Sequence, residues 1–259
     1  MKLIITGATG YVGGEVIRQA LSNPKVTSIV ALGRRETPVP ENLGPSADSS
    51  KFKSVICEDF NNYTDDVKKE IAGADACLWY VHHHHRLIMI LARVKTNCNR
   101  LLAVTPAKLK SMDYEDVKKI CFDYTVTSLK VLTDQPRGPG QKPLRYIYTS
   151  GSAAVRDPKL KPPVLGDYSV MRGQCEVESL QAAEANPEKL ETTVIKPGLI
   201  LSTDPAHESL MAALQEARRH MTVELPKVDL RELSAAALDI AINGNNGKDT
   251  YLNADLVEA

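Results

Sequence analysis

The chain has 259 residues, 43% of them hydrophobic and 25% charged, which allows one large domain or two small ones and excludes wholesale disorder. Its 32 Lys and Arg residues balance 32 Asp and Glu residues, so no basic excess indicates a nucleic-acid partner. The longest apolar run, 87–92, is too short to cross a bilayer, and the first residues lack the anatomy of a signal peptide. Five cysteines without a Cys-x-x-Cys pair fit reduced thiols, so we expect a cytoplasmic protein without a membrane partner.

Short strand-like runs alternate with amphipathic helical stretches along the chain. The expected strands are residues 3–5, 26–32, 53–57, 76–81, 144–148 and 192–195. The expected helices are residues 12–21, 64–72, 113–132, 169–186, 206–221 and 233–243. Strands separated by helices predict right-handed βαβ crossovers, and therefore an α/β fold with a doubly wound parallel sheet of the Rossmann type.

A glycine-rich segment joins the first predicted strand to the first predicted helix. Residues 6–14 read TGATGYVGG, and each glycine of the G-x-x-G-x-x-G spacing has a separate reason. Gly7 suits a sharp turn, Gly10 a close approach to a pyrophosphate, and Gly13 tight helix packing. The helix N-terminus would offer free N–H groups and a positive dipole end to the anion. We therefore predict a dinucleotide-binding turn; a structural turn without a ligand is the alternative. The predicted binding residues are Gly7, Thr9, Gly10, Tyr11, Val12 and Gly13.

Two arginines follow the second predicted strand, where an NAD-preferring site usually carries an acidic residue that binds the ribose 2′-hydroxyl. Guanidinium groups of Arg34 and Arg35 would instead pair with a 2′-phosphate. We therefore predict NADP(H) rather than NAD(H) as the cofactor; a solvated basic pair at a strand end is the alternative. Asp59, after the third strand, is either an acceptor for the adenine amine or an ordinary loop carboxylate.

The chain resembles the short-chain dehydrogenase/reductase superfamily, in its extended and atypical branches, which include sugar-nucleotide epimerase-like and NmrA-like proteins. The resemblance is carried by TGATGYVGG (6–14), GRR (33–35), GADA (73–76), YIYTSGSAAV (146–155), YSVMRG (168–173), IKPGLI (195–200) and the closing stretch 251–256. The motifs cover most of the chain to about residue 200. We expect a single NAD(P)-binding Rossmann domain over 1–259, with residues 201–259 as a small helical cap on the substrate side.

The resemblance implies catalytic roles for three side chains. In this family a Ser after the fifth strand holds the substrate oxygen, and a Tyr-x-x-x-Lys pair supplies the acid or base and its electrostatic partner. Ser152 matches the Ser and Tyr168 the Tyr, whereas Arg172 stands in the Lys position, one helical turn from Tyr168. Arg172 keeps the positive charge but cannot release its proton in a relay, so hydride chemistry is either modified or lost. Residues 196–198, which include Pro197, resemble the loop that passes the nicotinamide carboxamide in this family, although proline and glycine are also common at strand ends.

Residues 81–100 interrupt the resemblance. Relatives pass quickly from the fourth strand to the next helix through a loop that residues 103–106 resemble, so 81–100 form a predicted non-family insertion. The residues are compatible with a retained intron; a genuine surface helix and a lineage-specific loop are the alternatives. Four adjacent histidines, 82–85, begin the segment, but adjacent side chains diverge in any regular backbone, so we predict no metal site there. The insertion would lie beside the cofactor.

Two functions from different classes fit these residues. The first is an NADPH-dependent oxidoreductase or epimerase-like enzyme that acts on a small carbonyl or hydroxyl substrate, with Tyr168 as the acid or base. The second is a non-catalytic NADP(H)-binding regulator or scaffold of the NmrA-like type, which Arg172 and the short C-terminal part favour. Family members often dimerise, so a homo-oligomer is compatible with both.

Overall fold

The computed structural model describes residues 1–80, 114–162, 166–219 and 225–257. One parallel sheet contains the strands β1 (Lys2–Thr6), β2 (Ser28–Gly33), β3 (Phe52–Ile56), β4 (Ala76–Trp79), β5 (Leu144–Thr149), β6 (Leu190–Lys196) and β9 (Thr250–Leu252). Their order across the sheet is β3-β2-β1-β4-β5-β6-β9, and all neighbours are parallel. The doubly wound α/β sheet is therefore confirmed. The strand order reverses between β1 and β4, and sheets of this kind bind ligands at the carboxyl ends beside such a reversal.

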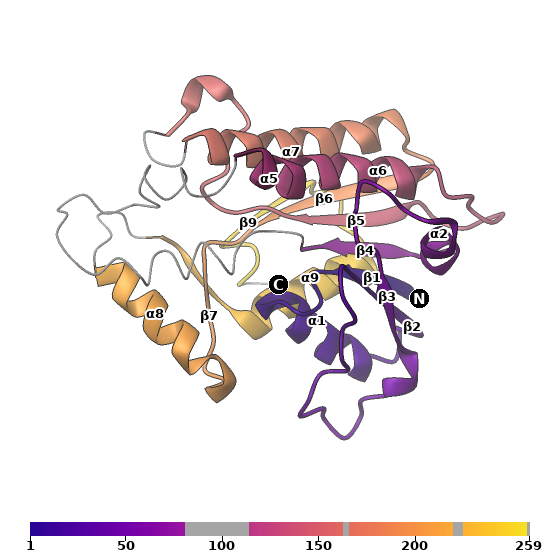
Figure 1. Cartoon of the computed structure of the whole chain (residues 1–259), viewed down its shortest axis with the longest axis horizontal. Coiled ribbons are helices and arrows are strands. Elements are labelled where there is room, and N and C mark those ends of the chain that lie inside the picture. The colour runs from indigo at the N-terminus through magenta and orange to yellow at the C-terminus, as the bar shows by residue number, and fades with distance from the viewer. Residues whose placement is uncertain (81–113, 163–165, 220–224, 258–259) are drawn as a thin grey trace.

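Helices cover both faces of the sheet (Figure 1). One face carries α1 (Tyr11–Ser22) and α9 (Leu230–Asn243); the other carries α2 (Asp65–Ile71), α6 (Tyr124–Thr133) and α7 (Gly166–Ala185). Residues of β1 and β4 are buried between these two layers, which is why both strands are continuous apolar runs in the sequence. The stripe predicted for the first helix is confirmed, because Val16, Ile17, Ala20 and Leu21 of α1 are buried.

The helix predicted over residues 113–132 contains a wider turn. A short helix, α5 (Tyr114–Lys118), passes into a π-helical stretch, Lys119–Asp123, before α6 continues. The carbonyl of Cys121 in this stretch accepts a hydrogen bond from the Thr125 hydroxyl at 2.8 Å. The Thr125 hydroxyl in turn accepts from the indole N–H of Trp79 at 3.0 Å, so the irregular stretch is tied to β4.

The C-terminal part divides between two places, whereas the sequence analysis expected residues 201–259 to form one cap. Helix α9 packs against α1, and β9 pairs with β6 and so extends the main sheet. Leu233, Ala237 and Ile240 explain this placement, because they lie on one face of α9 and are buried in the same apolar cluster as α1. The rest of the segment contains the strand β8 (Lys227–Asp229), which pairs in parallel with β7 (Leu199–Leu201) at the start of the segment, and the helix α8 (Glu208–Arg219), which stands apart from the sheet in Figure 1.

The remaining differences from the predicted elements lie mostly at their ends. The fourth strand ends at Trp79 rather than at residue 81, and the last helix begins at Leu230 rather than at residue 233. Strands β7, β8 and β9 were not expected, because three residues are too few to show a period. The predicted insertion, 81–100, and its histidines lie outside the described residues. None of the described helices is long and apolar enough to cross a membrane.

Candidate functional site

The glycine-rich turn leaves the carboxyl end of β1 and enters α1. Gly7 has φ +61°, a left-handed conformation that side chains disfavour, and a Cβ there would lie 2.7 Å from the Tyr80 carbonyl oxygen. The N–H of Gly10 donates to the Gly7 carbonyl at 2.8 Å and closes the turn. A Cβ at Gly13 would overlap the same carbonyl. The turn therefore needs glycine for two separate reasons, a left-handed backbone and close packing of α1.

The N-terminus of α1 fits a pyrophosphate. Gly10 is the N-cap residue and has no side chain to occupy the first N–H groups of the helix. The N–H groups of Tyr11, Val12 and Gly13 precede the first hydrogen bond of the helix, from Gly14 to Gly10. A Cβ at Gly10 would also lie 2.9 Å from the Gly7 carbonyl, so the open cradle depends on glycine. Free N–H groups and a positive helix end at the switch between β1 and β4 form the arrangement that binds dinucleotide phosphates.

The predicted adenosine side of the site lies at the ends of β2 and β3. Arg34 and Arg35 follow β2 and are exposed. The N–H of Cys57 donates to the Gly33 carbonyl at 2.8 Å, which brings the residues after β3 beside these arginines. Asp59 accepts hydrogen bonds from Lys119 at 2.8 Å and from the Asn61 N–H at 2.9 Å. The Lys119 ammonium holds the pKa of Asp59 below its usual range, so Asp59 has a partner that the sequence analysis missed.

Tyr168 and Arg172 lie one turn apart near the start of α7. Arg172 is 4% exposed, donates a hydrogen bond to the Thr149 carbonyl at 2.5 Å, and lies 5.0 Å from the centroid of the Tyr148 ring. Burial raises the pKa of Tyr168 to about 12, and the charge of Arg172 opposes that rise. Arg172 is thus anchored at the end of β5, and its electrostatic partnership with Tyr168 stays a prediction.

The two other predicted active-site residues lie on loops that hydrogen-bond to each other. The backbone N–H of Ser152, after β5, donates to the carbonyl of Pro197, after β6, at 2.9 Å. The N–H of Val155 in the same loop donates to the Ser169 carbonyl of α7 at 3.0 Å. The loop that carries Ser152 is thus tied to the helix that carries Tyr168. The Ser152 side chain is exposed, and its action with Tyr168 on one substrate oxygen stays a prediction.

A buried carboxylate holds these segments together, and the sequence analysis missed it. Glu176 is fully buried and accepts hydrogen bonds from Ser150 at 2.5 Å, Arg156 at 2.7 Å and Lys196 at 2.7 Å. The lysine also donates to the Ala154 carbonyl at 3.0 Å. Glu176 follows Arg172 by four residues and Tyr168 by eight, so the three polar side chains lie on one face of a helix. This spacing in the sequence could have predicted Glu176 as part of the site.

Tyr11, in the glycine-rich turn, faces the segment before α8. Its ring meets the ring of His207 edge-to-face, with centroids 4.6 Å apart. The Ser202 hydroxyl and Nδ1 of His207 are 3.1 Å apart and form a hydrogen bond within this segment. The predicted cap segment therefore contacts the predicted cofactor turn.

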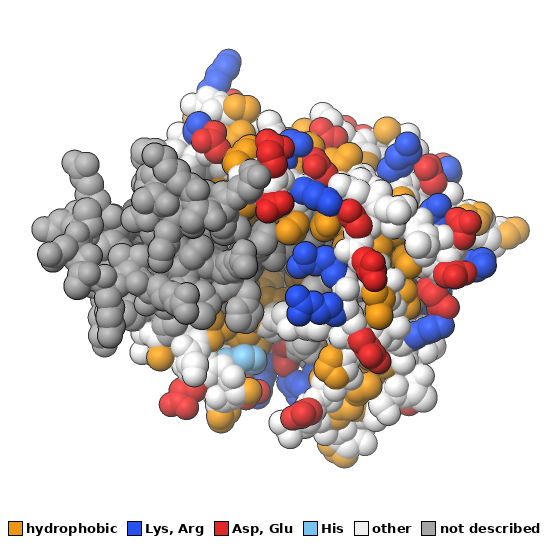
Figure 2. All heavy atoms as spheres, viewed as in Figure 1, with side chains coloured by type: hydrophobic (Ala, Val, Ile, Leu, Met, Phe, Trp, Pro, Cys, Tyr) orange, Lys and Arg blue, Asp and Glu red, His pale blue; other side chains and the backbone are white. Residues whose placement is uncertain are grey.

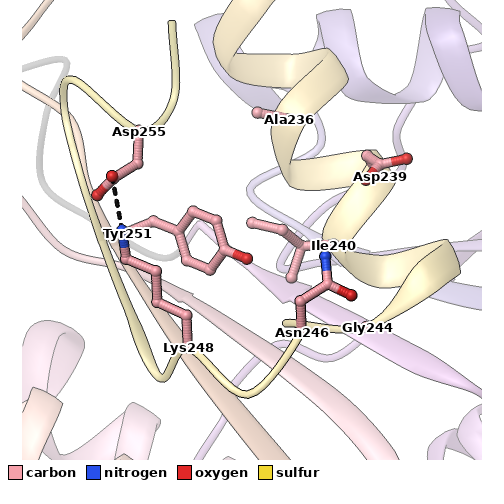
Figure 3. A pocket seen from close by; sticks show the side chains of 8 residues that line it. All are labelled: Ala236, Asp239, Ile240, Gly244, Asn246, Lys248, Tyr251 and Asp255. Atoms are coloured by element: carbon pink, nitrogen blue, oxygen red, sulfur yellow. Dashed lines mark ion pairs between the residues drawn. The ribbon is translucent and has the colours of Figure 1, made fainter. Parts of the chain in front are cut away.

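A separate polar pocket of about 290 Å³ lies beside the loop that leads from α9 into β9, at the amino-end side of the sheet. Lys248 and Asp255 form an ion pair of 2.6 Å across it (Figure 3). The Tyr251 ring points toward Ile240 and Asn246 in the same view. This pocket is distinct from the residues predicted to bind the dinucleotide.

Known proteins share the fold at low sequence identity, although no protein-family model matches the chain. Protein FMP52, mitochondrial, of Candida albicans is 23% identical over 254 residues, which are 96% of this chain and 91% of that protein. Vestitone reductase from alfalfa matches with a TM-score of 0.63 and 19% identity, over 97% of this chain and 76% of that one. Gre2 of Candida albicans, solved in complex with NADPH, matches with a TM-score of 0.62 and 16% identity, over 97% of this chain and 77% of that one.

These structural matches extend over nearly the whole chain. At such identities a structural match establishes the fold and leaves the activity to be argued from the site. The resemblance noted in the sequence is therefore confirmed at the level of the fold: the chain has the same Rossmann-type fold as vestitone reductase and Gre2.

Proposed function

We propose that the chain is an NADPH-dependent oxidoreductase that reduces a small carbonyl substrate. The observation that carries the proposal is the glycine cradle at the switch between β1 and β4, with Gly7 at φ +61° and a bare N-cap at Gly10. Arg34 and Arg35 at the end of β2 support NADPH over NADH, because guanidinium groups pair with a 2′-phosphate. The NADPH complex of Gre2, which has the same fold, is consistent with this choice.

Tyr168 is the proposed proton donor. The Tyr168 hydroxyl gives its proton to the carbonyl oxygen while a hydride, with its two electrons, adds to the carbonyl carbon, so the product is an alcohol. When bound, the nicotinamide supplies that hydride and becomes oxidised. Ser152 donates a hydrogen bond to the same oxygen, and the Arg172 cation stabilises the phenolate until solvent returns a proton.

The environment of Tyr168 suits a proton donor at neutral pH. With a pKa of about 12, the phenol carries its proton throughout the neutral range and is ready to act as an acid. The same pKa makes the phenolate scarce, so Tyr168 is a poor base for the reverse reaction. Burial is the main cause of the shift, and Arg172 reduces it.

The test is the Tyr168→Phe variant, assayed by NADPH consumption with a panel of aldehydes and ketones. We expect turnover to fall by roughly 10²- to 10⁴-fold, as for loss of a general acid, while the dissociation constant for NADPH stays within about twofold. Tyr114→Phe is the matched control, because Tyr114 is exposed on α5. Undiminished turnover in Tyr168→Phe would exclude the proposed acid.

A second candidate is an NADP(H)-binding regulator without hydride chemistry. Arg172 favours it, since its guanidinium is buried, donates to the Thr149 carbonyl and lies over the Tyr148 ring. A wild-type chain that binds NADPH tightly but reduces no member of the carbonyl panel would support this candidate against the enzyme.

The compartment is a further part of the proposal. The four described cysteines are buried, and Cys57, Cys77 and Cys175 are free thiols, in keeping with a reducing compartment such as the cytoplasm. The Candida relative is named mitochondrial, so imaging of a C-terminally tagged chain must distinguish the two locations.

A further inference from the structure

Three segments that are far apart in the sequence meet at the corner formed by the ends of β2 and β3. Arg34 follows β2, Asp59 follows β3, and Lys119 begins the π-helical stretch. The hydrogen bond from Cys57 to Gly33 joins the two strand ends, and Lys119 is 2.8 Å from Asp59. Figure 2 shows several Lys and Arg side chains near the middle of the face that it draws.

The wider helical turn helps to set the position of Lys119. A π turn contains one residue more than an α turn, and such turns are frequent at functional sites. Its ammonium lies 5.8 Å from the centroid of the Tyr124 ring, and the phenol of Tyr124 is within electrostatic reach of both Asp59 and Arg34. Lys119 therefore belongs to the same electrostatic group as Arg34, although its side chain is 43% exposed.

The charges explain why a lysine is needed there. Asp59 follows β3, whose end is joined by a hydrogen bond to the end of β2 that precedes Arg34, and an unpaired carboxylate there would repel a 2′-phosphate bound by Arg34. Lys119 neutralises Asp59 and keeps donors for another anion, since an ammonium has three N–H groups. The structure therefore offers a cation that is shared between a fixed carboxylate and an incoming phosphate.

We propose that Lys119 is a specificity-determining residue that binds the 2′-phosphate of NADPH together with Arg34. The inference rests on the proposed function, because it assumes that the glycine cradle binds a nicotinamide dinucleotide. It adds a residue from the opposite half of the Rossmann fold to the arginines that follow β2.

The test compares binding of NADPH and NADH to the full chain, measured by titration calorimetry with Lys119→Ala. We expect the dissociation constant for NADPH to rise by roughly tenfold or more, as for the loss of one charge-assisted hydrogen bond, and that for NADH to stay within about twofold. Lys118→Ala is the matched control. Lys118 is 42% exposed and pairs with Asp123 at 3.0 Å, so its removal should alter neither constant.

The variant Asp59→Asn and the cofactor fragment 2′,5′-ADP separate failure of the role of Lys119 from failure of the proposed function. Asp59→Asn should tighten binding of 2′,5′-ADP, because it removes the competing carboxylate and frees Lys119, and should leave 5′-AMP no tighter. A wild-type chain that binds neither dinucleotide overturns the proposed function itself. If wild type binds NADPH but Lys119→Ala weakens both cofactors equally, or neither, the role of Lys119 is overturned while the proposed function stands.

Discussion

At the residue scale, Glu176 shows how a buried charge is made tolerable. Transfer of a carboxylate from water into a protein interior costs several kcal/mol unless partners offset it. Glu176 has two cations, Arg156 and Lys196, and the Ser150 hydroxyl around it. These partners come from the end of β5, the following loop and the end of β6. A single side chain of α7 thus fixes the loop that carries the predicted substrate-binding Ser152.

The Glu176→Gln variant tests this role. The amide keeps the shape but removes the charge that Lys196 and Arg156 face, so we expect the free energy of unfolding to fall by roughly 3 kcal/mol. Urea denaturation followed by circular dichroism measures the change. Glu178→Gln, on the exposed side of the same helix, should change stability by less than about 0.5 kcal/mol. Equal effects of the two substitutions would show that the buried network contributes nothing specific.

At the element scale, two adjacent glycines of α1 differ in whether there is room for a side chain. A Cβ at Gly13 would overlap the Gly7 carbonyl, so Gly13→Ala must displace the helix or the turn. We expect a loss of about 1–3 kcal/mol of stability, as for overpacking, and strongly weakened NADPH binding. A Cβ at Gly14 would meet the Ala8 carbonyl at 3.7 Å, an ordinary contact.

Gly14→Ala is therefore the control for that prediction. Alanine in a helix interior is favoured over glycine by about 0.5–1 kcal/mol, so this variant should be as stable as wild type or more so, and should bind NADPH normally. Thermal unfolding with and without NADPH measures both properties. A Gly13→Ala chain that binds NADPH as well as Gly14→Ala would contradict the need for close packing at this turn.

The helices and strands also show which parts of the fold and of the candidate site can be predicted from the sequence. Apolar runs and helical stripes locate β1, α1 and the alternating order of the fold, because each element has enough residues to show its period. The cap was only partly predictable, since the pattern of α9 shows that one face is buried but not that α1 is its partner. The π-helical stretch has no periodic signal, because its apolar residues also fit an ordinary helix. Motif order located Tyr168 and Arg172, whereas Lys119 and Glu176 depend on contacts between distant segments.

At the scale of the whole molecule, the predicted chemistry lies along the carboxyl edge of the sheet. The glycine turn follows β1, the charged corner follows β2 and β3, and the loops with Ser152 and Pro197 follow β5 and β6. Parallel strands bring these five ends to one edge, which is why short motifs spread over the sequence converge. The pocket beside Tyr251 lies toward the other edge and belongs to the packing of α9 on β9.

Buried tyrosines on the face of the sheet covered by α6 and α7 should make the fold unstable in alkali. Burial raises the pKa of Tyr168 to about 12 and that of Tyr146 well above its usual value of 10. Below pH 10 the phenols are neutral in both the folded and the unfolded chain, so they add no pH dependence. Above pH 10 the unfolded chain ionises first. Each phenol that stays neutral in the fold then removes about 1.4 kcal/mol of stability per pH unit until its folded pKa is reached.

Urea denaturation between pH 8 and pH 11.5 measures this slope. Tyr146→Phe removes one buried phenol, whose hydroxyl lies 3.2 Å from that of Ser128, and should flatten the loss above pH 10 while it lowers stability slightly at pH 8. Tyr114→Phe removes an exposed phenol on α5 and is the matched control, whose slope should equal that of wild type. If the two variants show the same alkaline slope, the loss of stability arises from other groups, and buried tyrosines do not set the upper pH limit of this fold.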